Sequence, residues 1–158
     1  MSTLAIGTHD PVTTRKLVLG FVAGFIAVLL FHQPVVAMLA AMGIIKAGVY
    51  SMTATAPMGV PQVISLSFWG GVWGVLLAAA LRRYVDGALV IAATIFGAIL
   101  PSLVAWTVVA ALKGQPLFAG GAAKGIAVGL LVNAAWGLGT GTGLALFGRP
   151  GRLKMRAA

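Results

Sequence analysis

The chain contains no cysteine, which excludes disulfides, thiolate metal sites and cysteine nucleophiles. Acidic residues are nearly as scarce, because Asp10 and Asp86 are the only two in 158 residues. Charged residues make up 8% of the chain, against about 25% in soluble proteins, and 60% of its residues are hydrophobic. A soluble domain of this length does not bury so much apolar surface. The composition therefore predicts a protein whose solvent is lipid.

The same scarcity bears on function. The apolar runs contain no acid–base pair, no nucleophile–base pair and no cluster of metal-ligating side chains. We therefore expect no catalytic residue, no metal site and no cofactor, and we interpret the chain as a protein without enzymatic activity.

Four apolar runs are each long enough to cross a bilayer. The second run, at 1.5 Å per residue, spans about 30 Å of hydrocarbon. We predict an all-α, polytopic membrane protein with one four-helix transmembrane domain at 17–148, an N-terminal tail at 1–16 and a basic C-terminal tail at 149–158. The four runs are 17–45, 61–81, 87–112 (predicted to break at Pro101) and 125–148.

The first run begins like a secretory signal peptide, with the basic pair Arg15-Lys16 followed by LVLGFVAGFIAVLLF. Two features argue against cleavage. The apolar run continues past Pro34 to Met42, and a matching segment recurs later in the chain. We expect a retained helix.

Basic residues lie at the ends of the apolar runs and are divided unevenly between the two sides of the predicted bundle. The two tails and the 82–86 turn hold eight Lys and Arg, whereas the other two loops hold three, namely Lys46, Lys113 and Lys124. Cytoplasmic segments carry the excess of basic residues in membrane proteins. We therefore expect both termini and Arg82-Arg83 in the cytoplasm, near anionic lipid headgroups. The net charge of +9 then reflects topology and does not predict a nucleic-acid partner.

A shift of 67 residues aligns 15–82 with 82–149 without a gap. The coinciding residues, rather than their number, favour a duplication, because several are of types that are infrequent in this chain. We predict two tandem two-helix repeats that point the same way, related by an axis along the membrane normal. The aligned pairs include Arg15/Arg82, Gly20/Gly87, Pro34/Pro101, Lys46/Lys113, Trp69/Trp136, Gly70/Gly137, Gly74/Gly141 and Arg82/Arg149.

Small residues recur at helical spacing inside the spans. In lipid, such residues let helix backbones approach closely and gain dispersion energy. The run GLGTGTG at 137–143 has the composition of a nucleotide-binding loop, but such a loop follows a strand, and this run lies inside an apolar span. We expect helix contacts at Gly70, Gly74, Gly137 and Gly141. We expect Gly71 to face lipid.

Tryptophans occur inside the predicted spans, although this residue usually lies at the headgroup level. Trp69 and Trp73 are four residues apart in the second run, and Trp136 follows Asn133 in the fourth. An indole N–H away from water needs an acceptor. We therefore expect all three indoles to turn toward the bundle interior.

The tripeptide His32-Gln33-Pro34 is the most unusual polar feature of the spans. Pro34 cannot donate to the carbonyl of Leu30, and Pro101 likewise leaves that of Gly97 free. Because His32 and Gln33 lie beside the first gap, they are candidates either to fill it or to exploit it. Together with Asn133, they form our candidate intramembrane polar site, which serves either as packing at a kink or as part of a transport route.

Four methionines, Met38, Met42, Met52 and Met58, fall toward the side opposite the arginines. Thioethers are suitable ligands for Cu(I), so a copper site is one reading. Lipid-facing or loop-packing methionine is the alternative that we favour, because no tight methionine motif is present.

The strings FHQPV (31–35), APMGVPQ (56–62) and FWGGVWG (68–74) resemble a group of small bacterial inner-membrane proteins with no established activity. The resemblance implies a bacterial inner membrane and transfers no functional residue. We expect a small structural or accessory subunit. Its protein partner is either a larger membrane complex, which favours this interpretation, or further copies of the chain in a homo-oligomer, which favours the alternative. The alternative is a minimal oligomeric transporter or channel that uses the region of His32 and Gln33.

Overall fold

The computed structural model describes residues 13–148, so the predicted tail segments 1–12 and 149–158 lie outside the described residues. Four helices of this part are long and apolar enough to cross a membrane, as the sequence predicts. The chain is therefore an all-α, multi-pass membrane protein in its described part. Its four spans are Thr14–Ala41, Gln62–Ala80, Asp86–Leu112 and Ala123–Phe147.

The first span consists of three successive segments. Helix α1 covers Thr14–Ala27, a π-helical segment covers Val28–His32, and α2 covers Gln33–Ala41. The Thr13 side chain caps the start of α1 by accepting a hydrogen bond from the Lys16 amide. After α2, the chain crosses a loop that contains a small hairpin of β1 (Ala54–Thr55) and β2 (Val60–Pro61).

The second span is the single helix α3, Gln62–Ala80. The third contains α4 (Asp86–Val104), a π-helical segment (Ala105–Val109) and α5 (Ala110–Leu112). The predicted break at Pro101 is wrong, because α4 continues through this residue. A proline removes one backbone hydrogen bond, and neighbouring helices allow a transmembrane helix to continue past such a gap.

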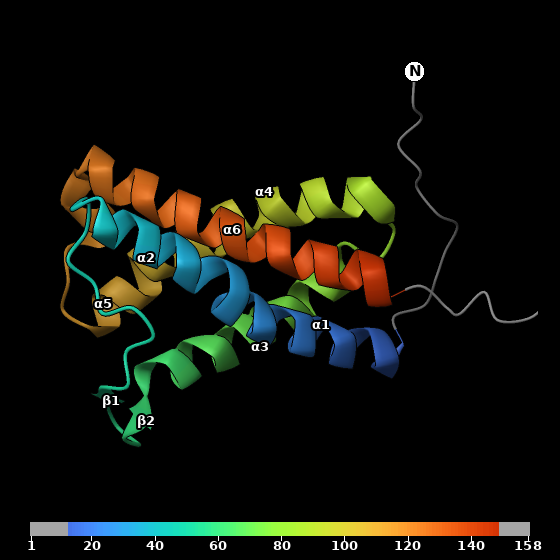
Figure 1. Cartoon of the computed structure of the whole chain (residues 1–158), viewed down its shortest axis with the longest axis horizontal. Helices are drawn as coiled ribbons and strands as arrows, with labels where there is room; N and C mark the ends of the chain where they lie inside the picture. Colours follow the sequence, from blue (N-terminus) through green and yellow to red (C-terminus); the bar gives the residue numbers. More distant parts are fainter. Residues whose placement is uncertain (1–12, 149–158) are drawn as a thin grey trace, which may run out of the picture.

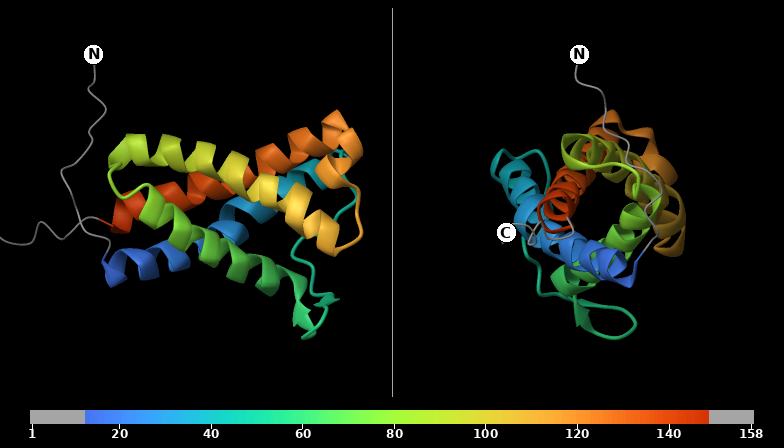
Figure 2. Two further views of the ribbon diagram at one scale, coloured as in Figure 1. Left: turned by 180° about the vertical axis from the view of Figure 1, so that it is seen from behind. Right: turned by 90° about the vertical axis from the view of Figure 1, so that its right-hand side faces the viewer.

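The fourth span is α6, Ala123–Phe147, and it follows a short 3₁₀ turn at Leu117–Gly121. Helix α1 packs along α3, and α4 packs along α6, so each consecutive pair of spans forms an antiparallel hairpin (Figure 1). The two hairpins meet mainly where α1 contacts α6, which makes these two helices the central pair (Figure 2).

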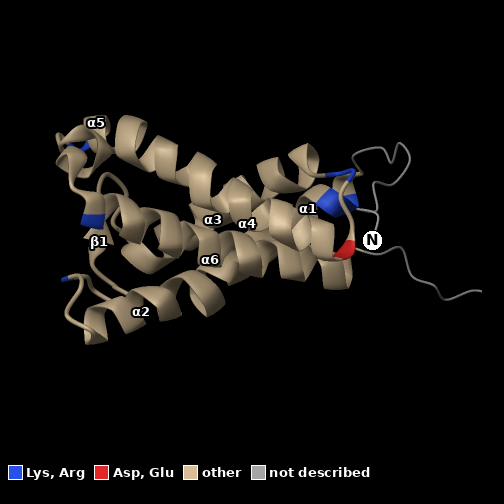
Figure 3. Ribbon diagram, turned by 90° about the horizontal axis from the view of Figure 1, so that it is seen from above, with Lys and Arg blue, Asp and Glu red and all other residues tan. Residues whose placement is uncertain are grey.

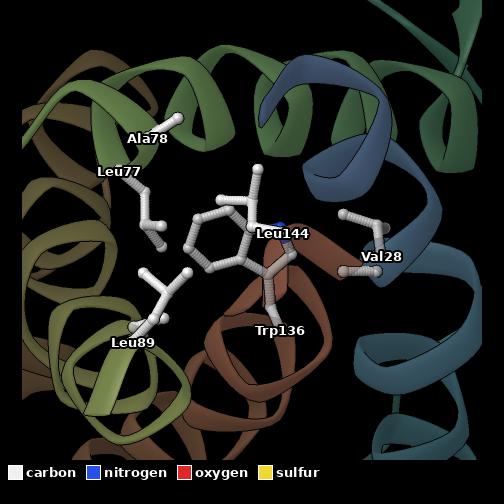
Figure 4. Close-up of a cluster of buried hydrophobic side chains, with 8 residues drawn as sticks. Val28, Leu77, Ala78, Leu89, Trp136 and Leu144 are labelled. Carbon is white, nitrogen blue, oxygen red and sulfur yellow. The ribbon is translucent and has the colours of Figure 1, made fainter. Parts of the chain in front are cut away.

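The core lies where the four spans meet. Side chains from all of them surround the Trp136 indole, which points toward Leu77 of α3 and Leu89 of α4 (Figure 4). Val28 of the first span, Ala78 of α3 and Leu144 of α6 complete the labelled group. This cluster joins the two hairpins through apolar contact.

The described basic residues occur only near the two ends of the bundle (Figure 3). We call the end with Arg15, Lys16 and the turn 81–85 the arginine end, and the end with loops 42–61 and 113–122 the loop end. At the arginine end, Arg15 Nη2 donates to the Phe147 carbonyl over 3.1 Å. A cation at the C-terminus of α6 complements the negative end of the helix dipole and ties the first span to the last.

Candidate functional site

The π-helical segment of the first span changes which carbonyl Pro34 leaves open. The Gln33 amide donates to the Val28 carbonyl, five residues back, instead of four. In this register, residue 34 is the donor for the Leu29 carbonyl, and proline has no N–H to give. The Leu29 carbonyl is therefore an open acceptor in this register, one residue before the position that α-helical geometry predicts.

Tyr50, from the loop that follows, fills this gap. Its hydroxyl donates to the Leu29 carbonyl over 2.7 Å. Its backbone N–H donates to Gln33 Oε1 over 2.8 Å, and the Gln33 side chain is buried, with 3% exposure. Tyr50 thus fastens the loop 42–61 to the first span at the level of Pro34.

Tyr50 makes these two bonds from an unfavourable backbone conformation. Its φ of 48° lies in the left-handed region, which L-residues other than Asn and Asp rarely adopt. Such a conformation persists when the surrounding structure holds it in place. The two hydrogen bonds are the contacts that hold Tyr50 here.

His32 ends the π-helical segment, and its Nδ1 is buried without a hydrogen-bond partner among the described residues. The positions Gly20, Gly24 and Val28 recur every four residues, and each meets α3 in the packed structure. The π-helical segment adds one residue to this spacing, so the buried Gln33 continues the series, and the segment contacts both α3 and α6. His32, one residue earlier, is partly buried, whereas Leu30 on the outward face is 64% exposed.

His32 lies in the half of the span that is nearer the loop end. Fifteen residues separate it from Leu17, the first apolar residue of the span, which corresponds to about 22 Å of a hydrocarbon thickness of about 30 Å. Tyr50 lies above it in the loop, with 44% of its surface exposed. His32, Gln33 and Tyr50 are thus close to the surface of the bilayer at the loop end.

The predicted association of Asn133 with this polar site does not take place through hydrogen bonds. Asn133 Nδ2 donates to Ser102 Oγ over 2.9 Å, and Ser102 Oγ donates to the Gly129 carbonyl over 3.3 Å. These bonds connect α6 with α4 in the second hairpin. Asn133 therefore belongs to a separate interhelical polar contact.

The predicted packing glycines lie at the closest helix contacts. A methyl group at Gly74 would meet the Gly20 carbonyl oxygen of α1, and one at Gly70 would lie 2.9 Å from the Gly24 carbonyl oxygen. In the second hairpin, a methyl group at Gly137 would meet the Ala93 carbonyl oxygen, and one at Gly141 would lie 2.6 Å from Ala93 Cβ. Backbone therefore lies against backbone along both seams.

The expectation that Gly71 faces lipid is wrong. Gly71 is buried, and a methyl group there would lie 2.7 Å from Cε2 of the Phe21 ring. The seam on α3 is therefore wider than the strip formed by Gly70 and Gly74. At Gly71, α3 contacts a side chain, the ring of Phe21, and not the backbone of α1.

The three tryptophans of the predicted inward faces have different environments. Trp136 is 3% exposed, and its Nε1 donates to the Gly24 carbonyl over 2.9 Å, as expected for a buried indole. Trp69 is 59% exposed, so its predicted inward orientation is wrong. Trp73 is half-buried and packs edge-on against Phe96 of α4. Gly70 and Gly74 occupy the inward side of α3, which leaves Trp69 on the outer side.

The four methionines of the copper reading are all exposed, with Met38 on α2 and the other three, Met42, Met52 and Met58, in the loop 42–61. Met42 directly follows α2, whereas Met58 lies in the β1–β2 hairpin, which occupies another corner of the loop end (Figure 1). Among residues 13–148, no group of three or more His, Cys, Asp or Glu is placed to hold a metal ion.

Sequence reasoning missed Tyr50 and Ser102. Tyr50 is the only aromatic residue between Phe31 and Phe68, in a loop of small residues, and this isolation is the one signal that marks it. Ser102 follows Pro101 directly, where a hydroxyl is a common partner near a proline in a span.

Comparisons of the chain with protein-family models, with curated proteins and with solved structures give no match. The function is therefore argued from the site and the packing alone.

Proposed function

We propose that this protein is a non-catalytic accessory subunit of a bacterial inner-membrane complex. The observation that carries the proposal is that most polar side chains inside the spans already have partners within the chain. Trp136 and Asn133 donate across helices, and the hydroxyls of Ser67 and Thr140 donate to carbonyls of their own helices. A route for solute needs polar groups that are free to exchange partners, whereas a scaffold does not.

The proposed environment is the cytoplasmic membrane, with the arginine end in the cytoplasm and in contact with anionic headgroups. Four basic residues of the described part lie at that end, namely Arg15, Lys16, Arg82 and Arg83. Four more lie in the tail 149–158, beyond the described residues. The asymmetry of Lys and Arg supports this orientation.

A second candidate function is that of a minimal oligomeric transporter or channel. The specific observation in its favour is the buried Nδ1 of His32 without a partner among the described residues. An unpartnered imidazole inside a span is a group that a permeant molecule can use. No second ionisable side chain lies beside it in the first span, since Arg15 and Lys16 stand at the arginine end.

Photocrosslinking in native membranes separates the two functions. A crosslinking amino acid is placed at one outward position of each span, namely Leu30, Trp69, Ile95 and Leu131, and at the buried Leu77 as a control. The accessory-subunit proposal expects at least one outward position, but not Leu77, to crosslink to the same heterologous membrane protein. That protein should then copurify in stoichiometric amount in mild detergent. Crosslinks only between copies of this chain, with a symmetric homo-oligomer on purification, would contradict the proposal and favour transport.

A further inference from the structure

Three hydrogen-bonding atoms belong to five consecutive residues of the first span: the Leu29 carbonyl oxygen, Gln33 Oε1 and His32 Nδ1. Tyr50 donates to the first two, and the third has no partner among the described residues. The two donors of Tyr50 come from a loop rather than from a neighbouring helix. A movement of this single residue therefore frees two acceptors, at residues 29 and 33, on either side of His32 in the sequence.

A buried imidazole nitrogen without a partner is costly, and lipid offers it no alternative. Buried polar atoms that the chain leaves unpaired are commonly satisfied by ordered water. The first span contains no acidic residue, and its basic residues stand at the arginine end. The site thus has no counter-charge for a cation, and its chemistry suits a neutral molecule.

We propose that His32, Gln33 and the Leu29 carbonyl form a binding site for a small neutral hydrogen-bond donor, and that Tyr50 is the strap that closes it toward the loop end. The ligand is water or a neutral solute of similar size with O–H or N–H groups. In the closed form, His32 Nδ1 accepts from the bound molecule, and Tyr50 covers the two other acceptors. In the open form, all three acceptors face the loop end.

The first test measures whether the site holds a small donor when all its own residues are unchanged. His32 is one of only two histidines, so a His9→Gln variant labelled with ¹⁵N-histidine in lipid bilayers reports on His32 alone. We expect magnetisation to pass from water protons to the His32 ring nitrogens. If a neutral solute other than water occupies the site, transfer comes from non-exchanging protons and survives in D₂O. No transfer of either kind would overturn the proposal, and this measurement needs no variant of the site itself.

The second test addresses the strap. Diethylpyrocarbonate, which carbethoxylates accessible imidazole, is applied to the wild type and to Tyr50→Phe in bilayers, and His32 is followed by peptide mass spectrometry. Loss of one hydrogen bond should raise the open population, and thus the modification rate of His32, about 2- to 10-fold. The matched control is Tyr84→Phe, which changes the only other tyrosine, at the arginine end. Equal rates at His32 in the wild type and Tyr50→Phe would contradict the strap.

Discussion

Trp136 combines the two kinds of contact that single residues make in this bundle. Its ring fills the apolar cluster between the spans, and its N–H reaches the Gly24 carbonyl, which also accepts the Val28 amide within the first span. The indole therefore joins α6 to the first span through a second bond on an already satisfied acceptor. Trp69, in contrast, is mostly exposed and makes edge-on contact with the ring of Phe68.

Replacing Trp136 with Phe should lower the free energy of unfolding by about 1–3 kcal/mol, because one buried hydrogen bond and part of the ring volume are lost. Trp69→Phe removes the same atoms from an exposed position and serves as the control. Reversible unfolding in mixed detergent micelles measures both. If the Trp69 variant is as destabilised as the Trp136 variant, the core is not where the structure locates it.

At the scale of the element, the first span depends on a loop for part of its backbone pairing. The π-helical register moves the proline gap to Leu29, and the hydroxyl of Tyr50 is the donor that satisfies it. The widened, π-helical part of this span has an identifiable cause. Pro34 removes a donor, and the Tyr50 side chain supplies the replacement donor to the Leu29 carbonyl.

A double-mutant cycle tests that link. Tyr50→Phe should cost about 1–2 kcal/mol in the wild type, because it leaves the Leu29 carbonyl unpaired. Pro34→Ala restores an N–H at position 34 that is able to donate to this carbonyl, so the same Tyr50 change should then cost little. Free energies of unfolding of the four proteins give the coupling. Equal costs in the two backgrounds would show that the hydroxyl and the proline gap are independent.

The glycine seam of α3 gives a graded prediction. Gly74→Leu should destabilise by about 1–3 kcal/mol, because the Gly20 backbone opposite it cannot move without separating α1 from α3. Gly71→Leu should cost less, since it meets the ring of Phe21, which is able to turn. Gly87→Leu, with nothing within 4 Å of its added carbon, is the neutral control. Melting temperature in detergent ranks the three, and a Gly71 variant worse than the Gly74 variant would reverse the order.

The elements were largely predictable from the sequence, and the site was not. The four spans follow from uninterrupted apolar runs, and Gly70 and Gly74 at helical spacing indicate where α1 approaches. The outward orientation of Trp69 does not follow from spacing, because an apolar residue suits lipid and core equally well. The role of Tyr50 depends on the π-helical register and on the path of a loop, and neither leaves a periodic pattern in the sequence.

At the scale of the whole molecule, the two hairpins resemble each other in arrangement but differ in detail. Each is sealed by glycines of its second helix. The aligned residues Trp69 and Trp136 differ in exposure, and the π-helical segment lies before Pro34 in one hairpin and after Pro101 in the other. The duplication remains a prediction. A solved structure in which Pro34 and Pro101 lie at different membrane depths would contradict it.

The orientation of the bundle decides whether the site at Tyr50 faces the periplasm or the cytoplasm. The proposed topology places the arginine end inside, so a reporter that is active only in the periplasm should stay silent when fused after Ala158. A strongly active fusion would be incompatible with four spans and a cytoplasmic N-terminus.

Single-cysteine labelling tests this topology most directly, because the chain has no cysteine of its own. Met58→Cys lies in the exposed hairpin at the loop end, and Val85→Cys lies in the exposed turn at the arginine end. In intact cells, a small maleimide that does not cross the inner membrane should label position 58, and should label position 85 only after the membrane is opened. Labelling of position 85 but not 58 in intact cells would contradict the account.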